Sequence, residues 1–294
     1  AKKGRNDIMK RFLFIFMAVI MILSCGNKNE SKKDENADKT VTEKKETGSS
    51  TLDKDEIVIG MELQFPPFET ITKDGKPTGI SVDMAEALGK YLGKKVRIEE
   101  VAYSGLIPAL TTGKIDLIIS SMTITDERKE QIDFSDAYAN AYLSLLISKN
   151  SSVQTPEDLN NKDVTIAVKK GTTGQILAQK VYPNAKLAVF EKESEAVQEV
   201  SQGKADAFIY DVYSIYKNWK ELPNTTRAYL KPISSEDTGS WGIGMRKNDE
   251  ELKNKVNEFL KAYASDGTRE QIINKYLGEV KQTFDKEKIP FFFQ

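Results

Sequence analysis

From residue 57 onward, short apolar runs alternate with stretches in which apolar residues recur at helical spacing. The short runs have the length and the β-branched content of buried strands. The stretches between them repeat apolar residues every three or four positions, as an amphipathic helix requires. Strands that alternate with helices indicate an α/β fold. The predicted strands cover 57–61, 96–101, 115–119, 142–147, 164–168, 187–190, 205–210 and 241–245.

Helix signals fall between these strands. Residues 80–93 and 249–265 each place their apolar residues on one face. A further helix is predicted to start at Thr155, an N-cap residue followed by Pro156 and two acidic residues. About eight strands in about 220 residues favour two α/β lobes over a single sheet.

The composition narrows the classes of function. The 294 residues include 43 Lys and Arg, 44 Asp and Glu, one Cys and no His. Without His there is no Ser-His-Asp nucleophile and no His-ligated metal, and one Cys forms neither an internal disulfide nor a four-cysteine site. The balanced charge argues against a nucleic-acid binder. Any enzyme would have to work through carboxylates, Lys or Tyr, so the composition favours a protein that binds its ligand. We expect no catalytic residue, no metal and no cofactor.

The first residues have a different character. An unbroken run of twelve apolar residues, 12–23, follows two basic residues. A membrane-spanning helix needs about 20 apolar residues, so this run predicts a secretory signal peptide within a leader over 1–24, with Met9 as a candidate start. Ile-Leu-Ser-Cys at 22–25 resembles a bacterial lipobox, in which the signal is cleaved before a cysteine that is then lipidated. We expect Cys25 to carry the lipid.

Residues 25–56 are rich in Lys, Asp and Glu and contain few core-forming residues. A mixed-charge segment of this kind cannot bury enough apolar surface to offset the entropy lost on ordering. The segment is therefore predicted to be a disordered tether between Cys25 and a folded unit that begins at Ile57.

Polar side chains follow four of the predicted strands. Ligands of open α/β sheets bind beyond the carboxyl ends of the strands, so residues at these positions are candidates for a site. Each also has an ordinary role in a cap or turn as an alternative. The residues are Glu62, then Ser120, Ser121 and Thr123, then Lys169 with the 171–174 turn, and finally Asp211.

Arg128 follows Thr125, a predicted N-cap, and so lies in the first turn of a helix. The helix dipole disfavours a cation there by about 0.3 to 1 kcal/mol, whereas a bound anion would be favoured by the dipole and the guanidinium together. Pairing of Arg128 with Asp126, Glu127 or Glu130 is the alternative.

Two aromatic features lie near these positions. Phe65 and Phe68 flank two prolines directly after the first predicted strand, where a rigid loop is suited to form one wall of a cleft. Core packing is the alternative for both residues and for Tyr103. The 171–174 turn lacks the Gly-Lys-Ser/Thr ending of a P-loop, so phosphate binding is not predicted there.

From about Ile57 to Leu277, the chain resembles solute-binding protein family 3, the amino-acid-binding proteins of bacterial ABC importers. The resemblance implies the type II periplasmic-binding-protein fold, an α/β fold of two Rossmann-like lobes joined by two crossing hinge strands, with the ligand enclosed between the lobes. The matching stretches are 60–69, 79–84, 105–110, 116–128, 134–136, 168–174, 205–211 and 241–247.

Within this fold we place the crossings near Ala141 and residues 232–234. Residues 281–294 extend beyond the family match and either pack on lobe 1 or are exposed. The predicted boundaries are 57–141 plus 234–280 for lobe 1, 142–233 for lobe 2 and 281–294 for the tail.

The resemblance also implies roles for individual residues. Arg128 matches the residue that holds the ligand's α-carboxylate, and Asp211 matches the acid that holds the α-ammonium. The remaining matches are Ser121, Thr123 and Thr173 near the carboxylate, Phe65 and Tyr103 as the aromatic pair, and Glu62 and Lys169 at the distal end of the ligand; Ser120 completes the predicted ligand-binding set.

The charges of these residues leave the ligand open. Arg128 and Lys169 balance Asp211 and Glu62, which suits a neutral polar amino acid such as glutamine. If Lys169 points to solvent instead, the site is acidic and suits arginine or lysine.

The resemblance implies a monomeric lipoprotein, anchored on the outer face of the bacterial cytoplasmic membrane, that passes its amino acid to ABC permease subunits. Cyclohexadienyl and arogenate dehydratases resemble these binding proteins, so an enzyme on the same fold is the alternative.

Overall fold

The computed structural model describes residues 50–233 and 238–293. The predicted leader, the lipidation at Cys25 and the tether up to residue 49 lie outside the described residues. Within the described ranges, no helix is long and apolar enough to cross a membrane.

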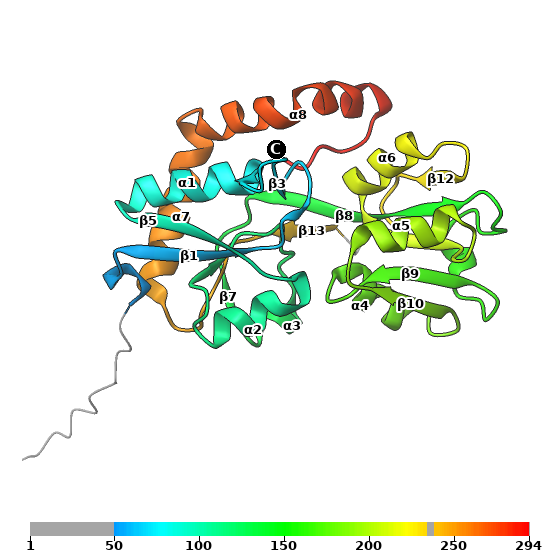
Figure 1. The fold of residues 1–294 in the computed structure, drawn as a ribbon, viewed down its shortest axis with the longest axis horizontal. Coiled ribbons are helices and arrows are strands. Elements are labelled where there is room, and N and C mark those ends of the chain that lie inside the picture. Colours follow the sequence, from blue (N-terminus) through cyan, green and yellow to red (C-terminus); the bar gives the residue numbers. More distant parts are fainter. Residues whose placement is uncertain (1–49, 234–237, 294) are drawn as a thin grey trace, which may run out of the picture. The chain divides into compact units, whose positions relative to one another are not determined.

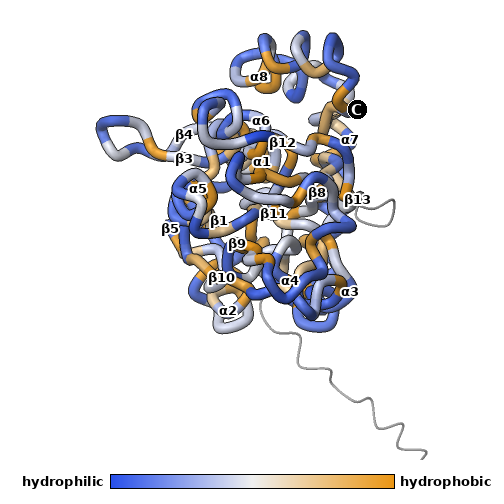
Figure 2. Tube along the Cα trace, turned by 90° about the vertical axis from the view of Figure 1, so that its right-hand side faces the viewer, coloured by the Kyte–Doolittle hydropathy of each residue, from blue (hydrophilic) through white to orange (hydrophobic). Residues whose placement is uncertain are grey.

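Lobe 1 is built on a sheet of five strands in the order β5-β1-β6-β14-β7. β1 pairs in parallel with β5 and β6, whereas β14 runs antiparallel to β6 and β7. A small three-stranded antiparallel sheet, β2-β3-β4, follows β1, and the exposed turn between β3 and β4 projects from the lobe as a hydrophilic loop (Figure 2). The strands are β1 (Glu56–Met61), β2 (Gln64–Phe65), β3 (Glu69–Ile71), β4 (Pro77–Thr78), β5 (Lys95–Glu100), β6 (Leu117–Ile118), β7 (Asp133–Phe134) and β14 (Gly244–Met245).

Alternation along β1 gives the lobe 1 sheet two apolar faces. Ile57, Ile59 and Met61 join a buried cluster with residues of α1, α7 and α8, whereas Val58 packs with residues of α2. Successive side chains of a strand point to opposite faces, so helices are required on both sides. The helices are α1 (Ile80–Leu92), α2 (Leu106–Thr111), α3 (Asp126–Lys129), α7 (Glu250–Ser265) and α8 (Thr268–Glu287), and the 3₁₀ turn η2 (Tyr103–Gly105) precedes α2.

Lobe 2 is built on a second sheet, in the order β10-β9-β11-β8-β12. β9 is parallel to β10 and β11, and β8 is antiparallel to β11 and β12. Its strands are β8 (Ala139–Ser148), β9 (Thr165–Lys169), β10 (Lys186–Phe190), β11 (Ala207–Asp211) and β12 (Thr226–Tyr229); its helices are α4 (Thr173–Val181), α5 (Glu193–Ser201) and α6 (Val212–Glu221).

Two strands connect the lobes (Figure 1). The first four residues of β8 pair with β13 (Thr238–Trp241), and the rest of β8 pairs with β11 and β12. After β13, the chain enters β14 of the lobe 1 sheet. The predicted architecture, two α/β lobes joined by two hinge strands, is therefore confirmed, while the exact lobe boundaries stay a prediction.

Three local predictions differ from the structure. The strand expected over 241–245 is divided into β13 and β14, because Gly242 leaves the hinge pairing to donate its N–H to the carbonyl of Met122. The helix expected at Thr155 is a single 3₁₀ turn, η3 (Pro156–Leu159); Thr155 occupies its N-cap position, where its N–H donates to the Asp158 carboxylate at 3.0 Å. The strand expected over 115–119 is limited to β6.

The folded unit begins before Ile57. Residues Thr51–Asp53 form a 3₁₀ turn, η1, and Thr51 is buried. The Thr51 N–H donates to Asp249 at 3.2 Å, and its hydroxyl accepts from Arg246 at 2.8 Å. The last residues of the segment predicted as a tether are therefore tied to lobe 1 by hydrogen bonds.

The segment after α8 packs against both lobes. The predicted boundary at residue 281 falls within α8, and Phe291 and Phe292 are buried. The Phe292 ring stacks on Trp241 of β13 with centroids 6.4 Å apart, and it meets Tyr213 of α6 edge-on at 6.1 Å. Its carbonyl accepts the N–H of Asn140, on β8, at 2.7 Å. Of the two placements left open for this tail, packing is the one observed, and it extends beyond lobe 1.

Replacing Phe292 with Ala should lower the free energy of unfolding by about 3 kcal/mol, because a buried aromatic ring is lost and a cavity is left. Phe293→Ala, which removes a half-buried ring next to it, is the matched control and should cost clearly less. Urea unfolding followed by circular dichroism measures both; equal midpoints for wild type and Phe292→Ala would contradict the packing described.

Candidate functional site

The candidate site lies where the carboxyl ends of β1, β6, β9 and β11 meet between the lobes. Eight of the ten predicted ligand-binding residues line one small cavity there, and the other two, Arg128 and Lys169, contact residues of its lining. Its volume is about 10 Å³, room for about one water molecule. The lining residues are Glu62, Phe65, Glu69, Tyr103, Ser120, Ser121, Thr123, Thr172, Thr173, Tyr210 and Asp211.

An ion pair between the lobes fills the centre of this region. Lys169, the last residue of β9, donates from Nζ to the Glu62 carboxylate, which follows β1. Lys169 is fully buried and Glu62 is 4 % exposed. Lys169 Nζ also lies 3.4 Å from the Tyr210 hydroxyl. Burial raises the pKa of Glu62, and the positive charge of Lys169 acts against that increase.

Arg128 is held by backbone carbonyls from both lobes. It lies in α3, whose N-cap Thr125 accepts the Arg128 N–H at 3.3 Å, as predicted. Its guanidinium donates to the carbonyl of Thr123 at 2.6 Å and to the carbonyl of Gly171, in lobe 2, at 3.0 Å. Arg128 is 5 % exposed and lies over the Tyr103 ring.

The alternative role for Arg128, an ion pair with an acidic neighbour, is wrong. Among the described residues, no carboxylate lies within ion-pair distance of its guanidinium, and Asp126 pairs instead with Lys129. Carbonyl groups supply only partial negative charge. Arg128 therefore presents a buried, unneutralised positive charge at the edge of the cavity, which favours an anion such as a carboxylate.

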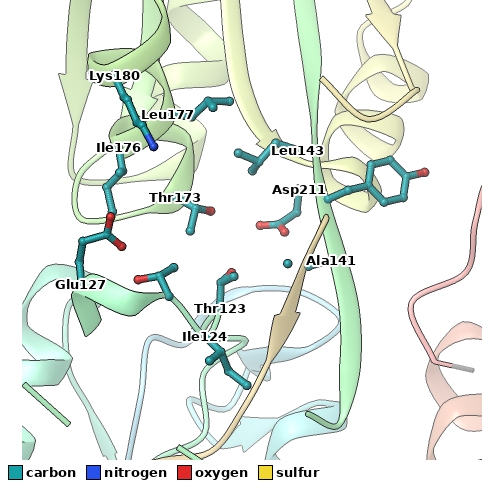
Figure 3. A pocket seen from close by; sticks show the side chains of 13 residues that line it. Thr123, Ile124, Glu127, Ala141, Leu143, Thr173, Ile176, Leu177, Lys180 and Asp211 are labelled. Atoms are coloured by element: carbon teal, nitrogen blue, oxygen red, sulfur yellow. The ribbon is translucent and has the colours of Figure 1, made fainter. Parts of the chain in front are cut away.

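Asp211 provides the opposite charge. It ends β11 and precedes α6, and its side chain forms no capping hydrogen bond to that helix. Burial raises the pKa of Asp211 to about 7, and the negative charge of Glu193 adds to the increase. Figure 3 shows its carboxylate directed into the space between Thr123 and Thr173.

A second, larger cavity of about 300 Å³ adjoins the first and shares Thr123, Thr173 and Asp211 with it. Lobe 1 contributes Glu127 to its lining, and lobe 2 contributes Lys180 (Figure 3). The space between the lobes is therefore open beside Asp211 and closed around Lys169. A ligand that uses both regions requires the Glu62–Lys169 pair to separate or the lobes to move.

Aromatic rings form one wall of the small cavity. Phe65 stacks on Phe68 with centroids 4.9 Å apart and meets Tyr210 edge-on at 5.7 Å. The Tyr103 ring lies beneath the charged groups of both Arg128 and Lys169. Phe65, in the segment after β1, therefore packs in the core and also lines the cavity. Both roles considered for it, core packing and a cleft wall, are observed.

The site segment around Thr123 is positioned by the hinge. Thr123 forms an isolated bridge with Trp241 of β13, and the N–H of Ile124 donates to the carbonyl of Ser240 at 2.8 Å. Movement of β13 is therefore transmitted through backbone hydrogen bonds to Thr123 and Ile124. The carbonyl of Thr123 in turn binds Arg128.

Sequence reasoning missed Glu69 and Tyr210 and included Thr172 only as part of the 171–174 turn, although all three line the small cavity. Glu69 lies in the Phe-Pro-Pro-Phe-Glu stretch, but it opens a short strand rather than following one, so the strand-end argument passes over it. Tyr210 belongs to a buried strand and reads as core. Among the described residues, no cluster of three or more His, Cys, Asp or Glu is arranged to hold a metal ion.

Replacing Lys169 with Met should shift the unliganded protein toward a more open form. Loss of one partner of a buried ion pair costs about 3 to 5 kcal/mol, and here separation of the lobes would rehydrate the remaining Glu62. Small-angle X-ray scattering should report a larger radius of gyration for Lys169→Met, and the double variant Glu62→Gln/Lys169→Met should return toward wild type. An unchanged radius for the single variant would contradict this.

The sequence of residues 57–279 matches the family model of bacterial extracellular solute-binding proteins, family 3. The ABC transporter glutamine-binding protein GlnH of Bacillus subtilis is 33% identical, with 93% of this chain and 98% of the relative covered. Two solved structures have a TM-score of 0.70. One is an ancestral amino-acid-binding protein described as a precursor of cyclohexadienyl dehydratase. It is 38% identical, and the aligned region covers 77% of this chain and 99% of that protein. The other is an ancestral arginine-binding protein bound to glutamine. It is 36% identical, and the aligned region covers 76% of this chain and 99% of that protein.

The two lobes, the hinge strands and the cleft are thus those of type II periplasmic amino-acid-binding proteins. The family match covers both lobes and every residue that lines the small cavity. The chain therefore belongs to the bacterial extracellular solute-binding proteins of family 3.

Proposed function

We propose that this chain is an extracytoplasmic lipoprotein that binds a polar L-amino acid between its lobes and delivers it to an ABC importer. The observation that carries the proposal is the arrangement of two opposite charges at one cavity. Among the described residues, Arg128 is a buried cation that hydrogen-bonds to carbonyls and to no carboxylate, and Asp211 is a carboxylate that makes no capping bond. Such a pair is suited to binding rather than catalysis.

An α-amino acid in water carries one positive and one negative charge, and burial of either without a partner is unfavourable. Arg128 can bind a carboxylate through two parallel hydrogen bonds, which Lys cannot do. Asp211 would accept hydrogen bonds from the ammonium group. Arg128 belongs to lobe 1 and Asp211 to lobe 2, so only the closed form satisfies both ends of the ligand.

The inward position of Lys169 favours a neutral side chain. With Lys169 paired to Glu62, the four charged groups of the site sum to zero, and both groups of the pair can hydrogen-bond a carboxamide. We therefore propose a neutral polar amino acid such as glutamine. A basic amino acid is the second candidate, since it would replace the Lys169 ammonium beside Glu62. Its relatives include a glutamine-binding protein and an ancestral arginine-binding protein bound to glutamine.

The membrane part of the proposal rests on the sequence. The apolar run over 12–23 and the lipobox-like sequence ending at Cys25 support a location on the outer face of the cytoplasmic membrane, with a lipid anchor on Cys25. Ligand-driven closure would then be the signal that the permease subunits recognise, with the protein acting as a monomer.

Thermal unfolding of the chain in the presence of each of the twenty amino acids tests the proposed ligand. A polar amino acid at 100 times its Kd should stabilise the fold by about 2.7 kcal/mol. Arg128→Ala should abolish that shift, while Arg227→Ala, which also removes a guanidinium bound to backbone carbonyls but lies outside the cleft, should retain it. A shift from none of the twenty would refute the proposal, and conversion of prephenate or arogenate would favour the dehydratase alternative.

Affinity should depend on pH through Asp211. The carboxyl has a pKa of about 7 without ligand, and an ammonium partner favours its ionised form. Binding below pH 7 must therefore release a proton, so affinity should fall as pH decreases, approaching about tenfold per unit. Calorimetry at several pH values measures this. Asp211→Asn should bind weakly and without this dependence, whereas Asp206→Asn, at the opposite end of β11, should behave as wild type.

A further inference from the structure

A buried carboxyl group lies directly behind the carboxylate end of the candidate site. Glu69, at the start of β3, is 1 % exposed. Three serine hydroxyls donate to its oxygens: Ser81 at 2.6 Å, Ser121 at 3.0 Å and Ser120 at 3.3 Å. Ser81 belongs to α1, and the other two follow β6. One side chain thus joins three separate segments of lobe 1.

These hydrogen bonds determine where the predicted ligand-binding serines point. The hydroxyl of Ser121 is directed to Glu69, and Ser121 has a left-handed backbone with φ of 47°, which is uncommon for a non-glycine residue. Ser120 donates to Glu69 and also accepts the N–H of Glu62 at 2.9 Å. Glu69 therefore holds the turn that leads to Thr123, whose carbonyl in turn holds Arg128.

The surroundings of Glu69 provide no cation in contact. Within the part of the chain that the structure describes, Glu69 makes no ion pair. Lys169 acts on it from a distance and is already paired with Glu62, whose negative charge opposes ionisation of Glu69. Two further titratable groups, Tyr103 and Tyr138, interact with it electrostatically, and the buried Tyr138 also interacts with the backbone of Ser121.

Burial raises the pKa of Glu69 to about 8, so the group is mainly a neutral acid at pH 7. A neutral group is what this location requires. An ionised Glu69 would place a second negative charge just behind the segment proposed to receive the ligand's carboxylate.

We propose that Glu69 is a positioning residue for ligand binding, which fixes the Ser120–Ser121 turn and through it the carboxylate-binding groups Thr123 and Arg128. The inference rests on the proposed function. It adds a residue of the cavity wall whose carboxyl acts through the serines and not by direct contact with the ligand's charges.

The test compares wild type with Glu69→Gln, Glu69→Ala and the control Ser135→Ala, which removes the hydroxyl of another buried lobe 1 serine. Calorimetry with L-glutamine and with L-arginine from pH 6.5 to 9 gives the affinities. At pH 7, Glu69→Gln should bind within about threefold of wild type because a carboxamide can keep these contacts, its oxygen accepting from two hydroxyls and its NH2 donating to the third, whereas Glu69→Ala should lose about tenfold or more.

The pH profile separates positioning from general structural support. A bound carboxylate favours the protonated form of Glu69, so wild-type affinity should decrease above pH 8 and Glu69→Gln should lack that part of the decrease. Deprotonation of the ligand's own ammonium affects both proteins equally. If Glu69→Ala does not fold, the profile of Glu69→Gln decides alone.

The outcomes are distinct for the two proposals. If wild type binds neither amino acid nor any other of the twenty, the proposed function and this inference both fail. If wild type binds but Glu69→Gln has the same pH profile, or Glu69→Ala binds as tightly as wild type, only the role of Glu69 is overturned. A tenfold loss in Ser135→Ala equal to that in Glu69→Ala would also overturn it.

Discussion

A buried positive charge without an anionic partner is the constraint on which the cleft depends. Removal of an ion from water costs several kcal/mol even after relaxation, and carbonyl dipoles from Thr123 and Gly171 offset only part of that cost at Arg128. Those two carbonyls belong to different lobes. The same charge therefore contributes to the attraction between the lobes and to the attraction for an anion, and the features around it serve to position it.

The Glu62–Lys169 pair gives the unliganded protein a second interaction between the lobes. A ligand shifts a conformational equilibrium only as far as it prefers one state over the other. If the lobes already attract each other through their own ion pair, a bound amino acid must replace that attraction as well as add to it. A closed form without ligand and a closed form with ligand then differ in what occupies the centre of the cleft, although the backbone arrangement is similar.

The sequence allowed much of the fold to be predicted, for identifiable reasons. Strand positions such as 57–61 and 187–190 follow from short apolar runs, and the structure agrees with them within a residue or two. The cap at Thr125 follows from local chemistry and forms as expected. The strand boundaries that were not predicted depend on strand pairing. The interval 241–245 is uniformly apolar, but its division between two sheets depends on partner strands about 100 residues away. Glu69 was missed because its role depends on serines from two other elements.

Trp241 occupies the point where the hinge strand, the cavity wall and the segment after α8 meet. Its ring is 1 % exposed, lies edge-on to Phe65 at 6.2 Å and stacks on Phe292, and its indole N–H has no hydrogen-bond partner among the residues that the structure describes. The chain holds two tryptophans, and the other, Trp219, lies on α6 of lobe 2. Indole fluorescence responds to the polarity around the ring. The emission of Trp241 should therefore change when the hinge strand that carries it moves.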